Sequence, residues 1–250
     1  MGLLDKLLKK GPKASEVTKG GSPVYRYEET EHEAWRPPQA YGEYAEEISG
    51  HFKALFPNRE EFVYHELISD LVHIDVNIMR PTEERPYYVM YTTGMSDMPM
   101  TLPEEIADRE DLKHAELFMF LPGEWNPGET GQLDSDIPDS EYWPIRLIKY
   151  LARFPHEYHT WLGWGHTMDN QRPFAEDTKL CGAILGEPQN IRKEGFFCHL
   201  PGGEEINFYQ VIPLYREELE YKLEHNAEAL LEKLAEADFV VHPDWPADLL

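Results

Sequence analysis

The sequence predicts an α+β fold in which a mixed, mostly antiparallel β-sheet is flanked by helices. Two segments with the two-residue alternation of β-strands, 72–79 and 87–93, follow each other directly, as in a hairpin. Segments with helical periodicity are clustered rather than interleaved with the strands. Because strands and helices do not alternate regularly, the pattern argues against a doubly wound parallel sheet.

The composition supports a folded, acidic protein. Of 250 residues, 41% are hydrophobic and 12% aromatic, which is enough for a real core and argues against disorder. The formal net charge of -24 repels nucleic acid and anionic membranes. We therefore expect neither as a partner, and we expect a protein partner to be basic.

Cysteine usage and hydropathy indicate a cytoplasmic protein. The chain has two cysteines, Cys181 and Cys198, which are best explained as reduced thiols. No apolar run approaches the roughly 18–20 residues that span a bilayer. The N-terminal sequence MGLLDKLLKKGPK has too short an apolar stretch for a secretory signal. We expect no membrane segment and no cofactor.

The first 24 residues differ from the rest. Residues 1–24 are predicted to form a basic amphipathic segment and a flexible linker, because leucines share one helical face and glycines and prolines follow. This segment could dock on the body, on a partner or on a membrane surface, but a loosely ordered terminus is favoured. Residues 25–250 are predicted to form a single domain.

The first elements of that domain are a helix and a strand pair. Residues 44–56 have an apolar stripe typical of a helix, which Pro57 ends. In 72–79 every second residue is aliphatic, and His73, Asp75 and Asn77 form the opposite face, as in a strand exposed on one side. A strand at 87–93 follows, and Gly94 ends it.

The middle of the chain predicts one buried strand and a second helix. Residues 117–121 are continuously apolar, which suits a strand covered on both faces. A polar loop at 123–138 leads to a helix that Pro144 opens and Pro155 ends. Residues 161–166 are then expected to be a strand, with Leu162, Trp164 and His166 on one side and glycines on the other.

The C-terminal part predicts two strands and a long helix. Residues 180–185 and 206–214 have strand character, and the second is apolar on both faces, as in a central strand. A single helix is expected at 216–236, with leucines on its inner stripe. Its outer face carries acidic residues at four-residue spacing, which form a ridge that a basic partner would contact: Glu220, Glu224, Glu228 and Glu232.

Three segments resemble one known family. They are PYYVMYTTGMSDMPM at 86–100, WPIRLIKYLARFPHEY at 143–158 and INFYQVIPLYREELEYKLEHN at 206–226. Their content and order resemble the suppressor-of-fused domain in its compact bacterial form, and the first contains that family's Gly-Met-Ser-Asp signature. The resemblance covers about residues 45–237.

The resemblance implies a protein-binding module of suppressor-of-fused-like fold, and not an enzyme. Animal relatives hold a transcription factor of the Hedgehog pathway in check. Bacterial relatives are similar to immunity proteins, which bind and block a cognate toxin. The family offers no catalytic residues to transfer to this chain.

Two groups of residues carry weaker hints of chemistry. His156, His159 and His166 could meet as metal ligands, although the His-Glu-x-x-His zinc signature is one residue short. Ser96, after Gly94, could suggest a nucleophile on a turn, but Ser96 and Asp97 are also preferred turn residues, and that interpretation is favoured.

These observations lead to one main functional hypothesis and two alternatives. The main hypothesis is a module that blocks a protein partner by steric occlusion, most simply as a bacterial immunity protein against a basic toxin domain. The first alternative is a regulatory or scaffold module for a non-toxin protein. The second is a metal-dependent hydrolase that uses His156, His159 and His166.

Overall fold

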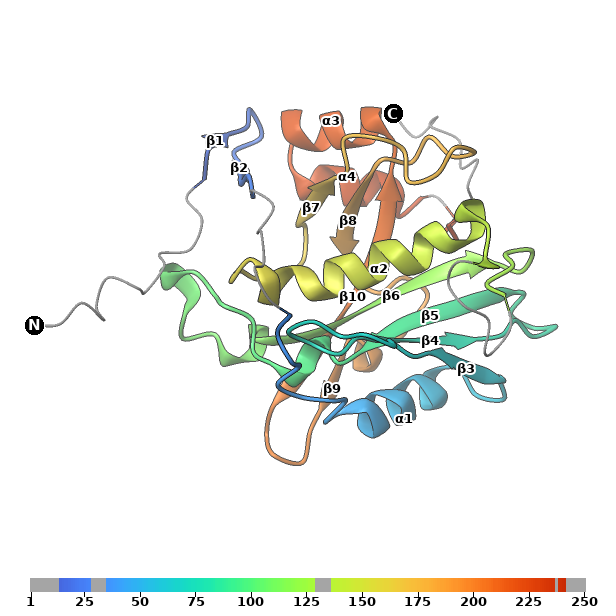
Figure 1. Ribbon diagram of the computed structural model, residues 1–250. Helices are drawn as coiled ribbons and strands as arrows, with labels where there is room; N and C mark the ends of the chain where they lie inside the picture. Colours follow the sequence, from blue (N-terminus) through green and yellow to red (C-terminus); the bar gives the residue numbers. More distant parts are fainter. Residues whose placement is uncertain (1–13, 28–34, 129–135, 237, 242–250) are drawn as a thin grey trace, which may run out of the picture.

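A mixed eight-stranded sheet forms the centre of the molecule (Figure 1). The computed structural model describes residues 14–27, 35–128, 136–236 and 238–241. The strand order is β3-β4-β5-β6-β10-β8-β7, and β9 pairs with β10. The strands are β3 (Glu61–Tyr64), β4 (Asp75–Met79), β5 (Tyr87–Thr93), β6 (His114–Pro122), β7 (Thr167–Asp169), β8 (Gly182–Gly186), β9 (Phe197–His199) and β10 (Glu205–Leu214). Every pair in this sheet is antiparallel except β6 with β10, which confirms the predicted fold class.

Four helices cover the two faces of the sheet. They are α1 (Ala45–Leu55), α2 (Asp139–Glu157), α3 (Arg216–Glu224) and α4 (Ala227–Leu234). Along β10, Tyr209 and Val211 point to the core cluster that contains α2. Phe208 points to the cluster of α1, and Ile212 to the cluster of α3 and α4. The helix α2 therefore covers one face, and α1, α3 and α4 cover the other (Figure 1).

The strand β6 lies in the middle and is buried on both sides, as predicted for 117–121. Leu117 and Met119 belong to the core on the α2 side, and Phe118 and Phe120 to the core on the α1 side. Burial of each such side chain contributes roughly 1.5–3 kcal/mol to stability.

One face of β4 differs from the prediction of a solvent-facing row. Val76 and Ile78 are fully buried, as expected, but on the other face Asn77 is only 6% exposed and Met79 is also buried. The reason is α1, which covers that face and contributes Phe52 to the same core cluster as Met79. The Asn77 amide is satisfied by a hydrogen bond to Thr93 Oγ1 at 3.1 Å.

Two further predictions of local structure are wrong. Residues 161–166 form no strand, because the His166 amide donates to the Gly163 carbonyl and Gly165 has φ of 76°, which makes a turn before β7. The expected single helix at 216–236 is two helices, because Asn226 adopts an extended conformation and its side chain caps α4 through the Ala229 amide.

Smaller differences concern the ends of elements. The helix α2 begins before Pro144 and continues through Pro155 to Glu157. The strand β3 lies at the edge of the sheet and had no predicted counterpart. No helix in the described ranges is both long and apolar enough to cross a lipid bilayer.

Residues 14–24, where a flexible linker was expected, include a small hairpin of β1 (Glu16–Val17) and β2 (Pro23–Val24). The Gly20 amide at its turn donates to the Leu223 carbonyl of α3 at 3.2 Å. The leucine-rich face of residues 1–13 lies outside the described residues. The division into a segment 1–24 and a domain 25–250 stays a prediction.

Candidate functional site

The Gly-Met-Ser-Asp motif joins four elements of the fold. Gly94 follows β5 with φ of 105°, and a Cβ atom built on it would lie 1.9 Å from the His73 carbonyl oxygen. Only glycine accommodates both this left-handed conformation and this close approach. Gly94 therefore fixes the distance between the end of β5 and the residues that lead into β4.

Glu116 on β6 is buried, and its carboxyl group accepts hydrogen bonds from the motif. Its Oε1 accepts hydrogen bonds from the amides of Gly94 (3.0 Å) and Ser96 (2.9 Å) and from the Ser96 hydroxyl (2.6 Å). Its Oε2 accepts from the Thr92 hydroxyl at 2.6 Å. Burial raises the pKa of Glu116 to about 7, although the hydrogen bonds from Ser96 and Thr92 oppose this. Ser96 is therefore a buried turn residue and not an accessible nucleophile.

The other two positions of the motif reach the helices. The Met95 carbonyl accepts a hydrogen bond from His156 Nε2 of α2 at 2.8 Å, and burial lowers the pKa of His156 to about 4. Asp97 Oδ2 accepts from the Gly42 amide, just before α1, at 2.5 Å. The motif thus positions the segment that carries Tyr41.

Two segments distant in sequence lie side by side next to this motif. Trp35 Nε1 donates to the Ser69 carbonyl at 2.6 Å, and the Leu71 amide donates to the Arg36 carbonyl at 3.0 Å. The Tyr41 ring lies 5.7 Å from the His73 ring. Residues 35–41 therefore run along residues 69–73 and form one continuous surface with them.

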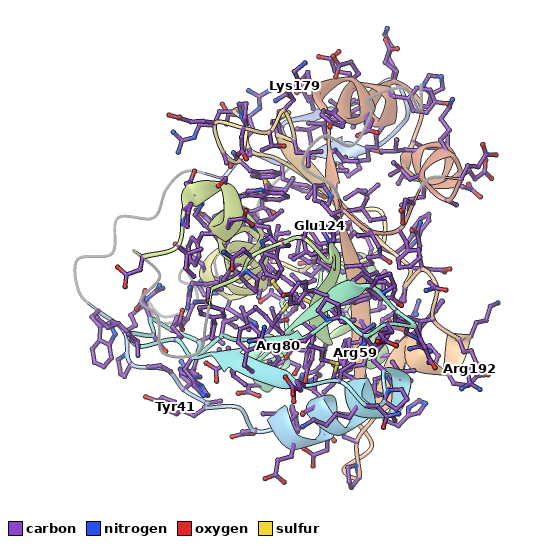
Figure 2. All side chains as sticks on the ribbon, turned by 90° about the vertical axis from the view of Figure 1, so that its right-hand side faces the viewer. Tyr41, Arg59, Arg80, Glu124, Lys179 and Arg192 are labelled. Carbon is purple, nitrogen blue, oxygen red and sulfur yellow. The ribbon has the colours of Figure 1, made fainter. Side chains whose placement is uncertain are left out.

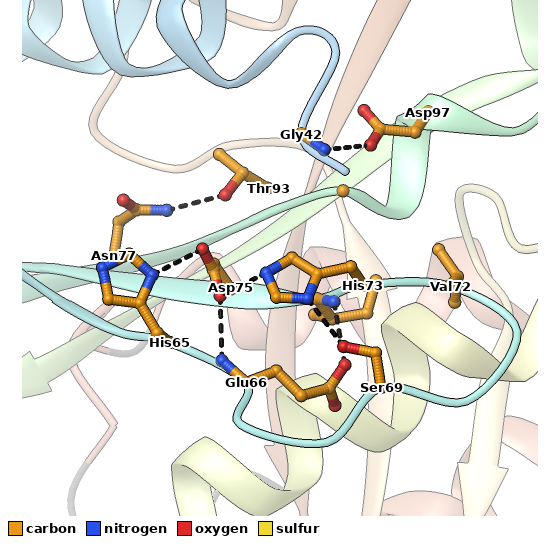
Figure 3. Close-up of polar contacts among 12 residues, drawn as sticks. Gly42, His65, Glu66, Ser69, Val72, His73, Asp75, Asn77, Thr93 and Asp97 are labelled. Carbon is orange, nitrogen blue, oxygen red and sulfur yellow. Dashed lines mark hydrogen bonds and ion pairs between the residues drawn. The ribbon is translucent and has the colours of Figure 1, made fainter. Parts of the chain in front are cut away.

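Carboxylates anchor the loop between β3 and β4 (Figure 3). Asp75 accepts hydrogen bonds from the Glu66 amide and from His65 Nδ1, both at 2.9 Å, and it pairs with His73 Nε2 at 3.1 Å. Glu66 pairs with Arg153 of α2 at 2.6 Å. These contacts fix both ends of the loop.

A second ion pair fixes the middle of the same loop. Arg36 pairs with Asp70 at 2.7 Å, and the Arg36 amide donates to the same carboxylate at 2.8 Å. The next residue, Leu71, has φ of 66°, a conformation that is strained for a residue with a side chain. The surrounding hydrogen bonds therefore hold the backbone in one particular shape.

This loop and the neighbouring segment 35–41 expose apolar side chains to solvent. Leu67 and Ile68 are each 82% exposed, Trp35 is 63% exposed and Tyr41 is 68% exposed. Figure 2 shows Tyr41 at the margin of the molecule. We call these four residues the apolar patch. Large apolar side chains held in fixed positions at the surface are typical of protein-interaction sites.

The chain of bonds from Ser69 to His73 to Asp75 has the residue types of a nucleophilic triad. Ser69 Oγ lies 2.6 Å from His73 Nδ1, and His73 Nε2 lies 3.1 Å from Asp75 Oδ1. A nucleophile must be open to a substrate, however, and Ser69 is only 8% exposed. The arrangement instead orders the loop.

The structure places the four predicted partner-contacting glutamates on two helices. Glu220 and Glu224 lie on α3, Glu228 and Glu232 lie on α4, and all four are exposed. Glu224 pairs with Lys19 of the hairpin at 3.1 Å. The continuous ridge expected from one helix is therefore wrong, while the assignment of these residues to a partner stays a prediction.

The structure does not bring the three histidines together as ligands. His156 is buried against Met95, His159 is exposed after α2, and His166 lies against the Trp161 ring at 4.5 Å. Among the described residues, no group of three or more His, Cys, Asp or Glu side chains could hold a metal ion. The metal-site alternative therefore has no geometric basis in these residues.

The residues of the apolar patch were missed by sequence reasoning. The signal available was Leu67-Ile68 in a polar stretch between two strands, which alone does not distinguish an exposed tip from a buried turn. Trp35 and Tyr41 lie in an irregular segment without periodicity, so only the fold shows that they join Leu67 and Ile68.

The comparisons with known proteins agree on one family. The family model described as Suppressor of fused protein (SUFU) matches residues 70–244. No curated protein matches the chain.

Solved structures show the same fold at low sequence identity. A SUFU homolog from Neisseria gonorrhoeae has a TM-score of 0.57 at 15% identity, over 82% of this chain and 98% of that one. A chain of the Sufu-Fu complex has a TM-score of 0.58 at 17% identity, over 86% and 93%. Drosophila Suppressor of Fused has a TM-score of 0.59 at 19% identity, over 86% of this chain and 52% of that one, so this chain spans about half of the Drosophila protein.

Proposed function

The chain belongs to the suppressor of fused family, and on that premise we propose that it binds one protein partner through the apolar patch and blocks it by steric occlusion. The observation that carries the proposal is the order of the loop at residues 65–73. Three carboxylates and two arginines fix a backbone whose tip exposes Leu67 and Ile68. A preformed apolar surface loses little conformational entropy when a partner covers it.

The charge around the patch favours a basic partner. Tyr41 precedes α1, and Glu43 before the helix and Glu46 and Glu47 in its first turn are all exposed. The whole chain carries a net charge of -24, which steers cationic proteins toward it and raises the rate of association. Glu220, Glu224, Glu228 and Glu232 supply a second acidic surface for the same partner.

A toxin domain is the partner that this proposal names, with the protein acting in the cytoplasm as its immunity protein. Occlusion needs no catalytic group, and the ordered Ser69 network offers no accessible nucleophile. Cys181 and Cys198 are free thiols, and burial raises the pKa of both, which suits a reducing compartment. A scaffold module that binds a non-toxin protein would use the same surface.

The test is a pull-down from host lysate with the tagged protein, washed at low and then at high salt, followed by growth rescue. The proposal expects one basic protein that salt releases, whose expression stops growth and whose effect this chain relieves. Binding without growth rescue would favour the scaffold function instead.

Matched variants locate the interface. The double substitution Leu67→Ser and Ile68→Ser should weaken capture by at least about tenfold, because contacts at the centre of an interface dominate its affinity. Val17→Ser is the control, since Val17 is 67% exposed on the β1–β2 hairpin. Equal capture of the partner by both variants would show that the interface does not include Leu67 and Ile68.

A further inference from the structure

A large groove lies between the β1–β2 hairpin and the body of the protein. Its volume is about 1250 Å³, and the hairpin, the segment 101–104, the end of α2, the turn before β7 and the helix α3 line it. The hairpin is held on both sides of this space, by the bond of Gly20 to Leu223 and by Tyr27, whose hydroxyl lies 3.1 Å from Thr160 Oγ1. Figure 1 shows the hairpin beside α3 and β7. The hairpin thus partly covers the groove, so a folded protein could not enter it.

An unpaired cation lies in the groove. Lys222 of α3 is only 6% exposed, yet among the described residues it forms no hydrogen bond or ion pair. Glu218, one turn earlier, is turned away and accepts from the Tyr215 amide at 2.8 Å. Burial lowers the pKa of Lys222. The Lys222 stem is buried, while its ammonium nitrogen is not among the fully buried atoms and has no counter-ion in the described residues, so an anion in the groove can reach it.

Four acidic residues line the groove, and in the part of the chain that the structure describes none of them, Glu104 included, forms an ion pair with Lys222; the other three are paired with other basic side chains. Glu16 pairs with Arg26 at 2.9 Å, and Asp169 pairs with Arg216 at 2.8 Å. Glu224 pairs with Lys19. In a chain of net charge -24, this leaves a cation in the depth of the groove without a matching carboxylate.

Aromatic side chains line the same groove as Lys222. Tyr27 packs edge-on against Phe154 at 4.8 Å and against Tyr158 at 5.0 Å. Trp161 and Trp164 lie on the turn before β7, and Trp164 is half exposed toward solvent. Such walls bind an apolar body by burial and by ring stacking.

A second nitrogen base lies near the lysine. His166 also lines the groove, and burial together with the charge of Lys222 lowers its pKa to about 4. The ring is therefore neutral near pH 7, and because its one N–H already donates to the Trp161 backbone it adds no second charge to the site. One cation and one neutral ring suit a ligand head with a single negative charge.

We propose that this groove binds a small carboxylic acid with an aromatic or branched apolar body, whose carboxylate pairs with Lys222 while the body lies between the aromatic walls. The site is separate from the apolar patch, which lies on residues 35–41 and 67–68. The proposal does not depend on the partner that the patch binds.

The test uses 3-phenylpropionate as the probe and its neutral amide, 3-phenylpropanamide, as the matched ligand. Binding to the full chain is followed by the fluorescence of Trp161 and Trp164 and by calorimetry. We expect the acid to bind at least about tenfold more tightly than the amide, since a hydrogen bond to a charged group is worth more than one between neutral groups. Equal binding of the two, or no binding of either, would overturn the proposal.

Two lysine variants separate the charge from the fold. Lys222→Met keeps most of the side-chain length and should remove the preference for the acid while the chain stays folded, because it removes a charge that pairs with no described residue. Lys179→Met, at an exposed lysine that does not line the groove, should change binding less than twofold. If Lys222→Met bound the acid as the wild type does, the carboxylate would not lie at Lys222.

A third arm tests the source of the carboxylate. Short peptides that end in phenylalanine, with a free or an amidated C-terminus, present the same head on a longer body. If only the free-terminus peptide bound and 3-phenylpropionate did not, the groove would be a site for chain ends, and the small-ligand assignment would be wrong.

Discussion

Oε1 of Glu116 accepts hydrogen bonds from both the backbone amide and the hydroxyl of Ser96, at 2.9 and 2.6 Å. One carboxylate oxygen on the central strand β6 therefore fixes a turn that begins at Gly94. Through Asp97 and the residues before α1, this turn also fixes Tyr41 of the apolar patch. The buried Glu116 therefore helps to position the exposed apolar patch.

Replacement of Glu116 should separate loss of the hydrogen bonds from loss of the charge. Glu116→Ala leaves the buried amides of Gly94 and Ser96 and the Ser96 hydroxyl without this acceptor, while the Thr92 hydroxyl can still donate to the Leu117 carbonyl at 3.3 Å, and it should lower the free energy of unfolding by roughly 3–5 kcal/mol. Glu116→Gln should cost much less, because its amide can donate to the Thr92 hydroxyl while its oxygen keeps the other donors. Urea unfolding at pH 7 measures both, and equal losses would contradict this account.

The contribution of Glu116 and Glu218 to stability should fall as the pH rises from about 4.5 to 7, while the buried neutral rings of His156 and His166, whose pKa is lowered to about 4, oppose that fall. Burial raises the pKa of Glu116 to about 7 and that of Glu218 to about 7, so the folded state holds these protons more tightly than the unfolded state. Their stabilisation is complete below pH 4.5 and is lost as the pH passes through 7. Urea midpoints at pH 5, 6, 7 and 8 should show Glu116→Gln becoming more stable relative to the wild type as the pH rises, because the variant lacks the Glu116 titration while both proteins share the other groups. A difference between the two proteins that stays constant with pH would assign the titration to other groups.

Substitution of Gly94 should be far more damaging than substitution of a glycine with the same backbone conformation. Gly94→Ala places a Cβ 1.9 Å from the His73 carbonyl oxygen and should cost about 4 kcal/mol or more. Gly203 has a similar φ of 100° but no atom within 4 Å, so Gly203→Ala should cost only about 1–2 kcal/mol. Thermal unfolding of the two variants gives the difference, and similar losses would mean that the strand end tolerates a shift.

Removal of the Arg153 side chain should loosen the loop that carries the apolar patch. Arg153 pairs with Glu66 and donates to the Val72 carbonyl at 3.2 Å, so Arg153→Met should cost roughly 2–3 kcal/mol. It should also speed hydrogen exchange at 66–73. Arg109→Met is the control, because Arg109 pairs with Asp111 at the exposed surface, where solvent screens the interaction. Unchanged hydrogen exchange at 66–73 in Arg153→Met would show that the remaining contacts of the loop are enough to keep it ordered.

Hydrophobic periodicity correctly predicted strands whose side chains are buried on one or both faces. The alternation around Ile78 and the continuous apolar run at 117–121 correctly indicated strands, because burial on one or two faces selects those residues directly. The covered second face of β4 could not be read in the same way. Asn77 is polar, and its burial depends on α1, which packs there from outside the strand.

The break at Asn226 and the apolar patch show two different limits. The break depends on a side-chain cap that competes with an otherwise good helical pattern, so periodicity alone favours one long helix. The patch depends on the meeting of 35–41 with 67–73, which no local pattern encodes. The Gly-Met-Ser-Asp resemblance identified the family, but its physical role became clear only from the contacts of Glu116 and His156.

The parallel pairing of β6 with β10 has a consequence for the order of synthesis. The strands β3 to β6 form a meander that can assemble as soon as Pro122 has left the ribosome. The β6 edge that pairs with β10 then stays open until residues 205–214 are made, which takes several seconds at roughly 5–20 residues per second. During that interval the nascent chain presents a long apolar strand with unpaired amides and carbonyls. Slow translation of this stretch would therefore favour aggregation, although it leaves the finished protein unchanged.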